Sequence, residues 1–342
     1  MLSYTDAKKK LIELAEDQLP EGFVEHAEAI VNLHLRDDTL AMPDMTDDDV
    51  YEIKQKIREG HGPDELAKLV KLEPTETKFG MFRVLARTQL NRQYIGQVTI
   101  GAIDPTRTPR VMELLPQLDI DTPISEADNQ KKLLEEWLNF ASQKRYQNIE
   151  NNARFYSPEA IRTLEIIHHS CPLLTPPDIG PSAKIRHRAQ GGMESWWKIA
   201  LGLISGLHFL QEREWDCFEA AHTEGLQADA IIDLIKQCSK SVHEFGKTLA
   251  GSFYADLGGS AFVKPDTHVI DCLRALGYEE GKELGRILRV LEIANHNAQS
   301  PRVVDKLLYI TCSGKFPLVD LKFRNPQITK HQFLGWLEEN RG

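Results

Sequence analysis

The sequence predicts an all-α protein, and three observations support this class. Helix start and stop signals occur nearly throughout the 342 residues, Ser, Thr, Pro and Gly stand where helices begin and end, and strand-like alternation is confined to residues 94–103. Even that stretch is compatible with a continued helix. The length exceeds one small core, so we expect two packed helical units, with one large helical unit as the alternative.

The N-terminal half contains four segments with helical signatures. Residues 1–19 form an amphipathic pattern of mixed charge, and residues 45–60 start at a Thr46 cap followed by acids and end at glycine. Residues 125–147 carry acids near the start and bases near the end, as the helix dipole favours. Residues 156–170 have serine as N-cap and proline at the first helical position.

A proline-rich stretch then interrupts the helical pattern. Residues 171–188 contain four prolines and a glycine, which exclude a helix. We expect an N-terminal helical domain at 1–170, a linker at 171–190 and a second domain at 191–342. In an alternative arrangement the N-terminal domain donates a helix at 79–100 to the core of the second domain. The second domain begins with an apolar helical pattern, and shorter segments follow, at 228–241, 242–259, 266–278, 281–297 and 300–316.

Composition excludes several classes of function. The five cysteines include no CxxC pair, and the adjacent histidines 168–169 have no partner at ligand spacing, so we expect no metal and no cofactor. No apolar run reaches the about 20 residues of a membrane span, and the N-terminus does not resemble a signal peptide, so we expect no membrane partner and a cytoplasmic protein.

The charge is uneven along the chain. The formal net charge is −10, and residues 1–70 hold 17 acidic against 8 basic side chains, whereas residues 282–330 hold 9 basic against 4 acidic ones. A local basic surface can attract a polyanion even when the whole chain is acidic. Nucleic-acid binding is therefore compatible with this composition.

The segment 242–278 carries the most distinctive pattern. Gly246 permits a strained turn, and Lys247 and Thr248 follow at a helix start, where backbone N–H groups can hold a phosphate. That helix ends at two glycines, and Lys264 with its following proline delivers Asp266 to the start of the next helix. An ordinary turn and an ordinary N-cap explain each part alone.

The combination resembles a known family. The stretch "EFGKTLAGSFYADLGGSAFVKPDTHVIDCLRALGY" is similar to the helix-hairpin-helix Gly/Pro-Asp (HhH-GPD) superfamily of DNA base-excision glycosylases, which are endonuclease III-like. In that family a hairpin ending in alanine is followed by a Pro/Val-Asp-x-His-Val run. Gly246 and Ala250 match the hairpin, and Asp266 begins the matching run 16 residues after Ala250. The resemblance covers about residues 228–316 and implies that the second domain, 191–342, is HhH-GPD-like.

The resemblance implies a DNA glycosylase with Asp266 as the catalytic residue. It implies DNA contacts by Gly246, Lys247, Thr248, Lys264 and His268. The partner would be duplex DNA with an altered base, bound by a monomer at a bacterial-type nucleoid. The hairpin departs from the family, reading Ser-Val-His-Glu-Phe-Gly instead of Leu-Pro-Gly-Val-Gly, and the iron–sulfur cysteines of some members are absent.

The same resemblance does not decide whether the enzyme also cleaves the DNA strand. Members that also cleave the strand use a lysine two residues before the alanine as nucleophile. Ungapped matching on Ala250 puts Thr248 there and Lys247 one residue earlier, a helical rotation of about 100°. We favour a monofunctional enzyme. A bifunctional glycosylase/lyase using Lys247 is one alternative; a catalytically silent DNA-binding or scaffold module and an unrelated helical interaction protein are others.

In the implied reaction, a carboxylate stabilises the oxocarbenium character of the sugar after the nucleotide has flipped out of the duplex. In the family, a glutamine-bearing helix helps to fill the gap that the flipped nucleotide leaves in the duplex. Residues 79–96 and residues 196–215 both resemble that helix, and we favour residues 196–215. Trp196 and Trp197 stack on a base or pack in the core, and core packing is the commoner role. The candidates for the base pocket are Gln89 on the first segment, and His208, Gln211, Trp196 and Trp197 on the second.

Overall fold

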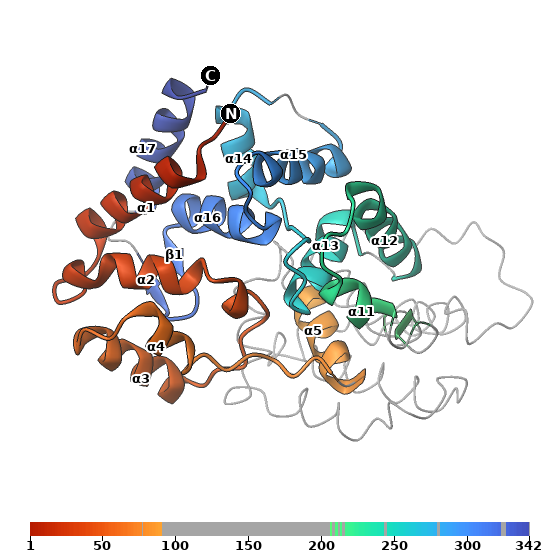
Figure 1. The fold of residues 1–342 in the computed structure, drawn as a ribbon, viewed down its shortest axis with the longest axis horizontal. Helices are drawn as coiled ribbons and strands as arrows, with labels where there is room; N and C mark the ends of the chain where they lie inside the picture. The colour runs from red at the N-terminus through yellow and green to blue at the C-terminus, as the bar shows by residue number, and fades with distance from the viewer. Residues whose placement is uncertain are drawn as a thin grey trace, which may run out of the picture. The chain divides into compact units, whose positions relative to one another are not determined.

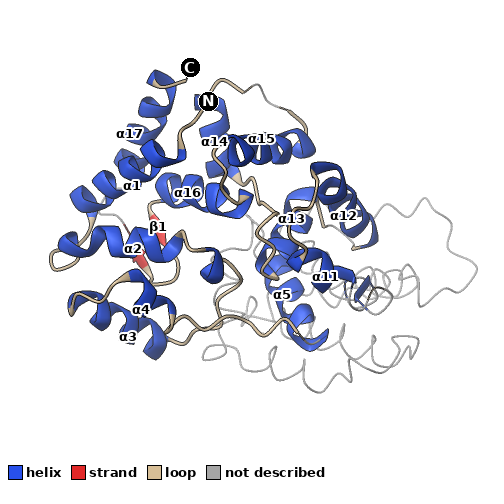
Figure 2. Cartoon of the chain, in the orientation of Figure 1, coloured by secondary structure: helices blue, strands red, loops and turns tan. Residues whose placement is uncertain are grey.

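The computed structural model describes residues 1–76, 78–90, 206, 209–210, 213, 216–242, 245–278, 281–322 and 326–341. Within these residues the chain forms 12 α-helices and one pair of two-residue strands, which confirms the predicted all-α class (Figures 1 and 2). The segments expected at 94–103, 125–147 and 156–170 lie outside the described residues, as does the expected linker.

Residues 1–74 contain four α-helices. They are α1 (Tyr4–Gln18), α2 (Ala27–His34), α3 (Asp47–Arg58) and α4 (Pro63–Ala67), with 3-10 turns at Val24–His26 and Asp37–Thr39. The predicted Thr46 cap is confirmed: its hydroxyl accepts the N–H of Asp49, and the Asp49 carboxylate accepts the N–H of Thr46. This reciprocal capping box explains why α3 begins where it does.

The rest of the described chain is also helical. It comprises α5 (Lys78–Leu90), α11 (Asp216–His222), α12 (Ala228–Ser241), α13 (Lys247–Asp256), α14 (Thr267–Ala275), α15 (Glu283–His296), α16 (Pro301–Ser313) and α17 (Pro326–Glu339). The strands β1 (Lys315–Phe316) and β2 (Leu321–Lys322) pair antiparallel after α16. The sequence did not predict this short hairpin, because two-residue strands carry too little alternation to be recognised.

The chain divides into two compact units that interleave along the sequence. One unit contains Met1–Pro74, Trp215–Lys236 and Lys247–Gly342, and the other contains Thr75–Glu214 and Gln237–Gly246. In the second unit α5 presents apolar side chains to a core, and Gly206 lies against Leu85. Every residue of the site described below belongs to the first unit, except where stated. The expected linker at 171–190, which was to separate the two domains, lies outside the described residues.

Helix α16 is the central element of the first unit. It packs against α1, α14, α15 and α17 (Figure 1). Most of its side chains are buried. Ser300 caps its start, Pro301 occupies the first helical position, and Gly314 ends it in a left-handed conformation with φ of 65°. The Sγ atoms of Cys272 on α14 and Cys312 on α16 lie 3.1 Å apart in this core, and burial raises the pKa of Cys272.

The N-terminal segment is attached to the C-terminal helices by hydrogen bonds as well as by packing. The N–H of Tyr4 donates to Asn297 Oδ1 at 2.8 Å, and Asn297 Nδ2 donates to the carbonyl of Leu2 at 2.7 Å. The hydroxyl of Ser300 donates to Asp37 at 2.7 Å. The first 74 residues therefore share a core with the helices that carry Asp266.

A buried histidine links α2 to the turn between the two strands. His34 Nδ1 donates to the carbonyl of Ile30 at 2.8 Å, and Nε2 accepts the N–H of Leu318 at 3.1 Å. The bond that Nε2 accepts requires a neutral ring, because a protonated Nε2 has no free lone pair. Burial, aided by the charge of Lys306, lowers the pKa of His34 to about 3.

We expect His34 to make the fold acid-sensitive. Below pH 6.5 an unfolded chain protonates this ring and the folded chain does not, so stability is lost as the pH falls towards 3. The loss is about 2 kcal/mol between pH 6.5 and pH 5. Urea unfolding at both pH values should show a smaller pH dependence for His34→Gln than for wild type. The exposed His331→Gln variant is the control and should keep the wild-type dependence; equal slopes in all three proteins would contradict the assignment.

Candidate active site around Asp266

The loop that delivers Asp266 begins at the glycines after α13. The N–H of Gly258 donates to the carbonyl of Ala255 at 3.1 Å, and the N–H of Gly259 donates to that of Tyr254 at 3.0 Å. Gly258 has φ of 108°, which only glycine adopts without strain. These two bonds form a Schellman motif, so the predicted stop at the glycine pair is confirmed.

Asp266 caps α14, as the sequence predicts. Its backbone is extended, and its Oδ1 accepts the N–H groups of His268 at 2.9 Å and Val269 at 3.1 Å. The side chain is half-buried, and Oδ2 accepts no hydrogen bond from the described residues. One oxygen is thus fixed by the helix, whose N-terminus stabilises negative charge, while the other is available to a ligand.

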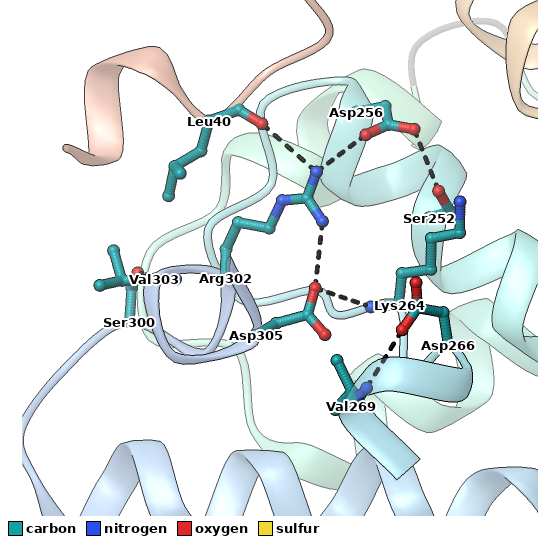
Figure 3. Close-up of polar contacts among 10 residues, drawn as sticks. All are labelled: Leu40, Ser252, Asp256, Lys264, Asp266, Val269, Ser300, Arg302, Val303 and Asp305. Carbon is teal, nitrogen blue, oxygen red and sulfur yellow. Dashed lines mark hydrogen bonds and ion pairs between the residues drawn. The ribbon is translucent and has the colours of Figure 1, made fainter. Parts of the chain in front are cut away.

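A buried ion cluster lies beneath this loop (Figure 3). The guanidinium of Arg302 on α16 contacts Asp256 Oδ1 at 2.9 Å and Asp305 Oδ2 at 3.3 Å. Ser252 donates to Asp256 Oδ2 at 3.0 Å, and the Arg302 backbone N–H donates to Ser260. The cluster therefore joins the end of α13, the loop and the start of α16.

The cluster holds the segment immediately before Asp266. Asp305 Oδ2 accepts the backbone N–H of Lys264 at 3.3 Å, and the Lys264 carbonyl accepts the N–H of Asp266 at 2.7 Å (Figure 3). Two consecutive hydrogen bonds thus connect the buried Asp305 to the backbone of Asp266. We assign Asp305 and Arg302 as positioning residues for the Asp266 carboxylate.

The N-terminal segment reaches the same cluster. The N–H of Met42 donates to the Asp256 carbonyl at 3.0 Å, and the Arg302 guanidinium donates to the Leu40 carbonyl at 3.5 Å. Residues that precede the site by more than 200 positions therefore help to fix it. No sequence pattern predicted this role for residues 40–42.

Burial shifts the pKa values of two groups on α16, Asp305 and Lys306. It raises the pKa of Asp305 to about 6, although the charge of Arg302 opposes the shift. It lowers the pKa of the neighbouring Lys306 to about 8, with the charge of Arg302 acting in the same direction. Nearby Asp266 contributes to the raised pKa of Asp305. Shifted pKa values of this kind are frequent at functional sites, and structural ion clusters also produce them.

His268 lies beside Asp266 and packs edge-on against Tyr309, with ring centroids 5.9 Å apart. Burial lowers the pKa of His268, while the nearby carboxylates of Asp266 and Asp271 oppose the shift. Its Nδ1 atom is buried and accepts or donates no hydrogen bond within the described part of the chain. The ring is therefore held by packing, next to the cap.

Gly251 allows α13 to lie directly on the loop. A Cβ atom at this position would come 2.4 Å from the carbonyl oxygen of Val263, closer than any real Cβ contact. Val263 is only three residues from Asp266, so the absence of a side chain at Gly251 sets the height of the loop above the helix. The sequence did not identify this residue, since a glycine inside a helix has several explanations.

The predicted DNA-contacting residues of α13, Lys247 and Thr248, lie next to a carboxylate of α15. Lys247 Nζ lies 3.9 Å from Glu283 Oε2, and the Thr248 hydroxyl donates to Glu283 Oε1 at 3.4 Å. Glu283 is the first residue of α15. The structure therefore places Lys247 with this carboxylate, whereas Asp266 lies with His268 and Asp305. Gly246 is exposed and belongs to the other unit.

Most predicted base-pocket residues fall outside the described part of the chain. These are Trp196, Trp197, His208 and Gln211. Gln89 is described, is buried in α5 and belongs to the second unit, so its placement relative to Asp266 is not defined.

Comparisons with known proteins return no match: none is found among protein-family models, curated proteins or solved structures. Two further findings concern the described residues alone. No group of three His, Cys, Asp or Glu side chains there is arranged to hold a metal ion. No helix there has the length and apolar character to cross a membrane.

Proposed function

We propose that this protein is a DNA glycosylase that hydrolyses the N-glycosidic bond of an altered base, with Asp266 as the catalytic carboxylate. One observation carries the proposal: a half-buried aspartate has one oxygen fixed by two helix N–H groups and the other without a partner among the described residues. The Asp-Thr-His-Val run that begins there supplies the resemblance to the glycosylase superfamily.

The chemistry requires a fixed negative charge near C1′ of the flipped nucleotide. As the bond to the base breaks, positive charge develops on the sugar, and the unpartnered Oδ2 of Asp266 would stabilise it. The same oxygen can orient the attacking water. The ion cluster below contributes by limiting movement of the loop, which matters because displacements of about 1 Å cost large factors in rate.

The contact of Lys247 with Glu283 supports a monofunctional reaction over a lyase. A nucleophilic lysine must reach the same carbon that Asp266 faces. An amine that lies 3.9 Å from a carboxylate on α15 is directed away from that carbon. The silent DNA-binding module remains the second candidate function.

The proposal is tested with a panel of duplexes that each carry one altered base. Wild-type protein should generate an alkali-labile abasic site in at least one of them, without cleaving the strand itself. Retention of every duplex without product would favour the silent module. Neither retention nor product would favour a helical protein that does not act on DNA.

Borohydride trapping on the productive duplex decides the role of Lys247. A monofunctional enzyme leaves no covalent adduct. An adduct in wild type that disappears in Lys247→Met would replace our assignment with the lyase mechanism. An adduct that persists in Lys247→Met would assign the nucleophile to another amine.

A further inference from the structure

A second concave site lies at the opposite end of α14 from Asp266. It is a pocket of about 330 Å³ between the C-terminal half of α14, the turn that follows and the first turns of α15. Its lining combines three arginines, one tyrosine, two aliphatic side chains and three glycines. They are Arg274, Arg286, Arg289, Tyr278, Ile270, Leu273, Gly277, Gly281 and Gly285.

The turn that shapes this pocket is rigidly built. The N–H of Gly277 donates to the Arg274 carbonyl at 2.8 Å, and the N–H of Tyr278 donates to the Leu273 carbonyl at 3.0 Å. Gly277 has φ of 85°. This second Schellman motif ends α14 and fixes Tyr278, whose ring lies under the guanidinium of Arg289 at 5.3 Å from its centroid.

The arginines give the pocket its binding character. Arg274 pairs with Asp271, which also binds Lys330, and Arg289 pairs with Glu292. The Arg289–Glu292 pair is about half exposed on both sides and is therefore weak. The Arg286 side chain is partly buried and has no ion-pair or hydrogen-bond partner among the described residues. A planar, permanently charged donor without a carboxylate partner is suited to an oxyanion such as a phosphate.

The position of the pocket relates it to the proposed reaction. Arg274 follows Asp266 by eight residues on the same helix, which corresponds to about 12 Å along the axis. The N-terminus of α13 lies near, because Lys247 and Thr248 contact Glu283, one turn before Arg286.

We propose that the Arg274–Arg286–Arg289 pocket binds a backbone phosphate of the DNA strand that Asp266 acts on. This inference rests on the proposed function for its choice of ligand. The contact would position the strand along α14 and would carry no sequence information.

Salt dependence of duplex binding tests the pocket. The Arg286→Gln/Arg289→Gln variant should bind a duplex more weakly, and the slope of log K against log salt should shrink by about 0.9 for each phosphate that the variant no longer neutralises. Lys54→Gln/Lys68→Gln, which removes two cations near α3 and α4, is the matched control and should keep the wild-type slope. Glu279 and Glu280 follow Tyr278 in the sequence and lie outside the described residues. The measured salt slope reports the net effect of the arginines and of these two acids together.

Competition by inorganic phosphate distinguishes binding in the pocket from non-specific electrostatic attraction of the duplex. At constant ionic strength it should compete with the duplex for wild type and lose this effect in the arginine variant. Equal slopes, or equal competition in both proteins, would overturn the inference. The base-release assay tests the proposed function independently. If base is released but the arginine variant keeps the wild-type salt slope, only the phosphate-binding inference is wrong. If the slope is reduced but no base is released from any duplex, only the glycosylase proposal is wrong.

Discussion

Replacing Arg302 by methionine should lower the free energy of unfolding by about 3–5 kcal/mol, the usual cost of leaving a buried charge without its partner. Arg302 is 6% exposed and contacts two carboxylates, Asp256 and Asp305. Methionine fills part of the space but compensates neither charge. The loop before Asp266 would lose its anchor, so base release should fall as well.

The pH dependence distinguishes this mechanism from a simple packing defect. Burial already raises the pKa of Asp305 to about 6, and Arg302 opposes that rise. Without Arg302 the folded protein holds the Asp305 proton at higher pH. The stability deficit of Arg302→Met should therefore be largest at pH 7 and should shrink as the pH falls to 5.

Urea unfolding at the two pH values measures this effect. Adding Asp305→Asn to Arg302→Met should recover part of the stability at pH 7, because the amide can still accept the N–H of Lys264 without a charge. Lys56→Met, which breaks an exposed pair with Glu59, is the control and should leave the stability nearly unchanged at both pH values. A deficit independent of pH, with no recovery in the double variant, would show that packing alone explains the result.

Gly251→Ala should separate α13 from the loop that leads to Asp266. The added methyl would lie 2.4 Å from the Val263 carbonyl oxygen, which is backbone and has no alternative rotamer. Overpacking of this kind typically costs about 1–3 kcal/mol. Even a shift of about 1 Å at Asp266 can reduce a rate by about 100-fold, so the rate of base release should fall together with stability.

Gly335→Ala is the matched control for this prediction. Gly335 lies inside α17, and a Cβ there would meet nothing within 4 Å. The same substitution should therefore be neutral or stabilising by up to about 1 kcal/mol, with unchanged base release. Thermal unfolding and single-turnover base release should be measured on both variants. Equal behaviour of the two would mean that the loop does not depend on close packing at Gly251.

Local signals in the sequence predicted most of the described helices around the site. The Thr46 cap, the stop at Gly258 and the Asp266 cap each depend on a few adjacent residues, and all three are confirmed. These features could be predicted because capping and left-handed turns select particular residue types at fixed offsets.

The residues that hold the loop before Asp266 in place could not be predicted from such local signals. Arg302 and Asp256 are 46 residues apart, and Leu40 precedes Arg302 by 262, so only the tertiary fold brings them together. One signal was present: Arg302 and Asp305 lie one turn apart on a helix rich in apolar residues, and charges on a buried face require partners. The partner itself cannot be read from such spacing.

Base release by Asp266→Asn compared with wild type tests the central claim most directly. Asparagine caps helices about as well as aspartate, so the variant should keep the bonds from His268 and Val269 and lose only the charge. Asp233→Asn, on the exposed side of α12, controls for the loss of one carboxylate.

The assay is single-turnover release of the base from the productive duplex, with melting temperature and duplex affinity measured on the same samples. We predict a loss of at least about 100-fold in rate for Asp266→Asn, in line with the removal of one electrostatic interaction from a transition state, with stability and affinity unchanged. Asp233→Asn should match wild type. A folded, DNA-binding Asp266→Asn protein that releases the base at the wild-type rate would contradict the account.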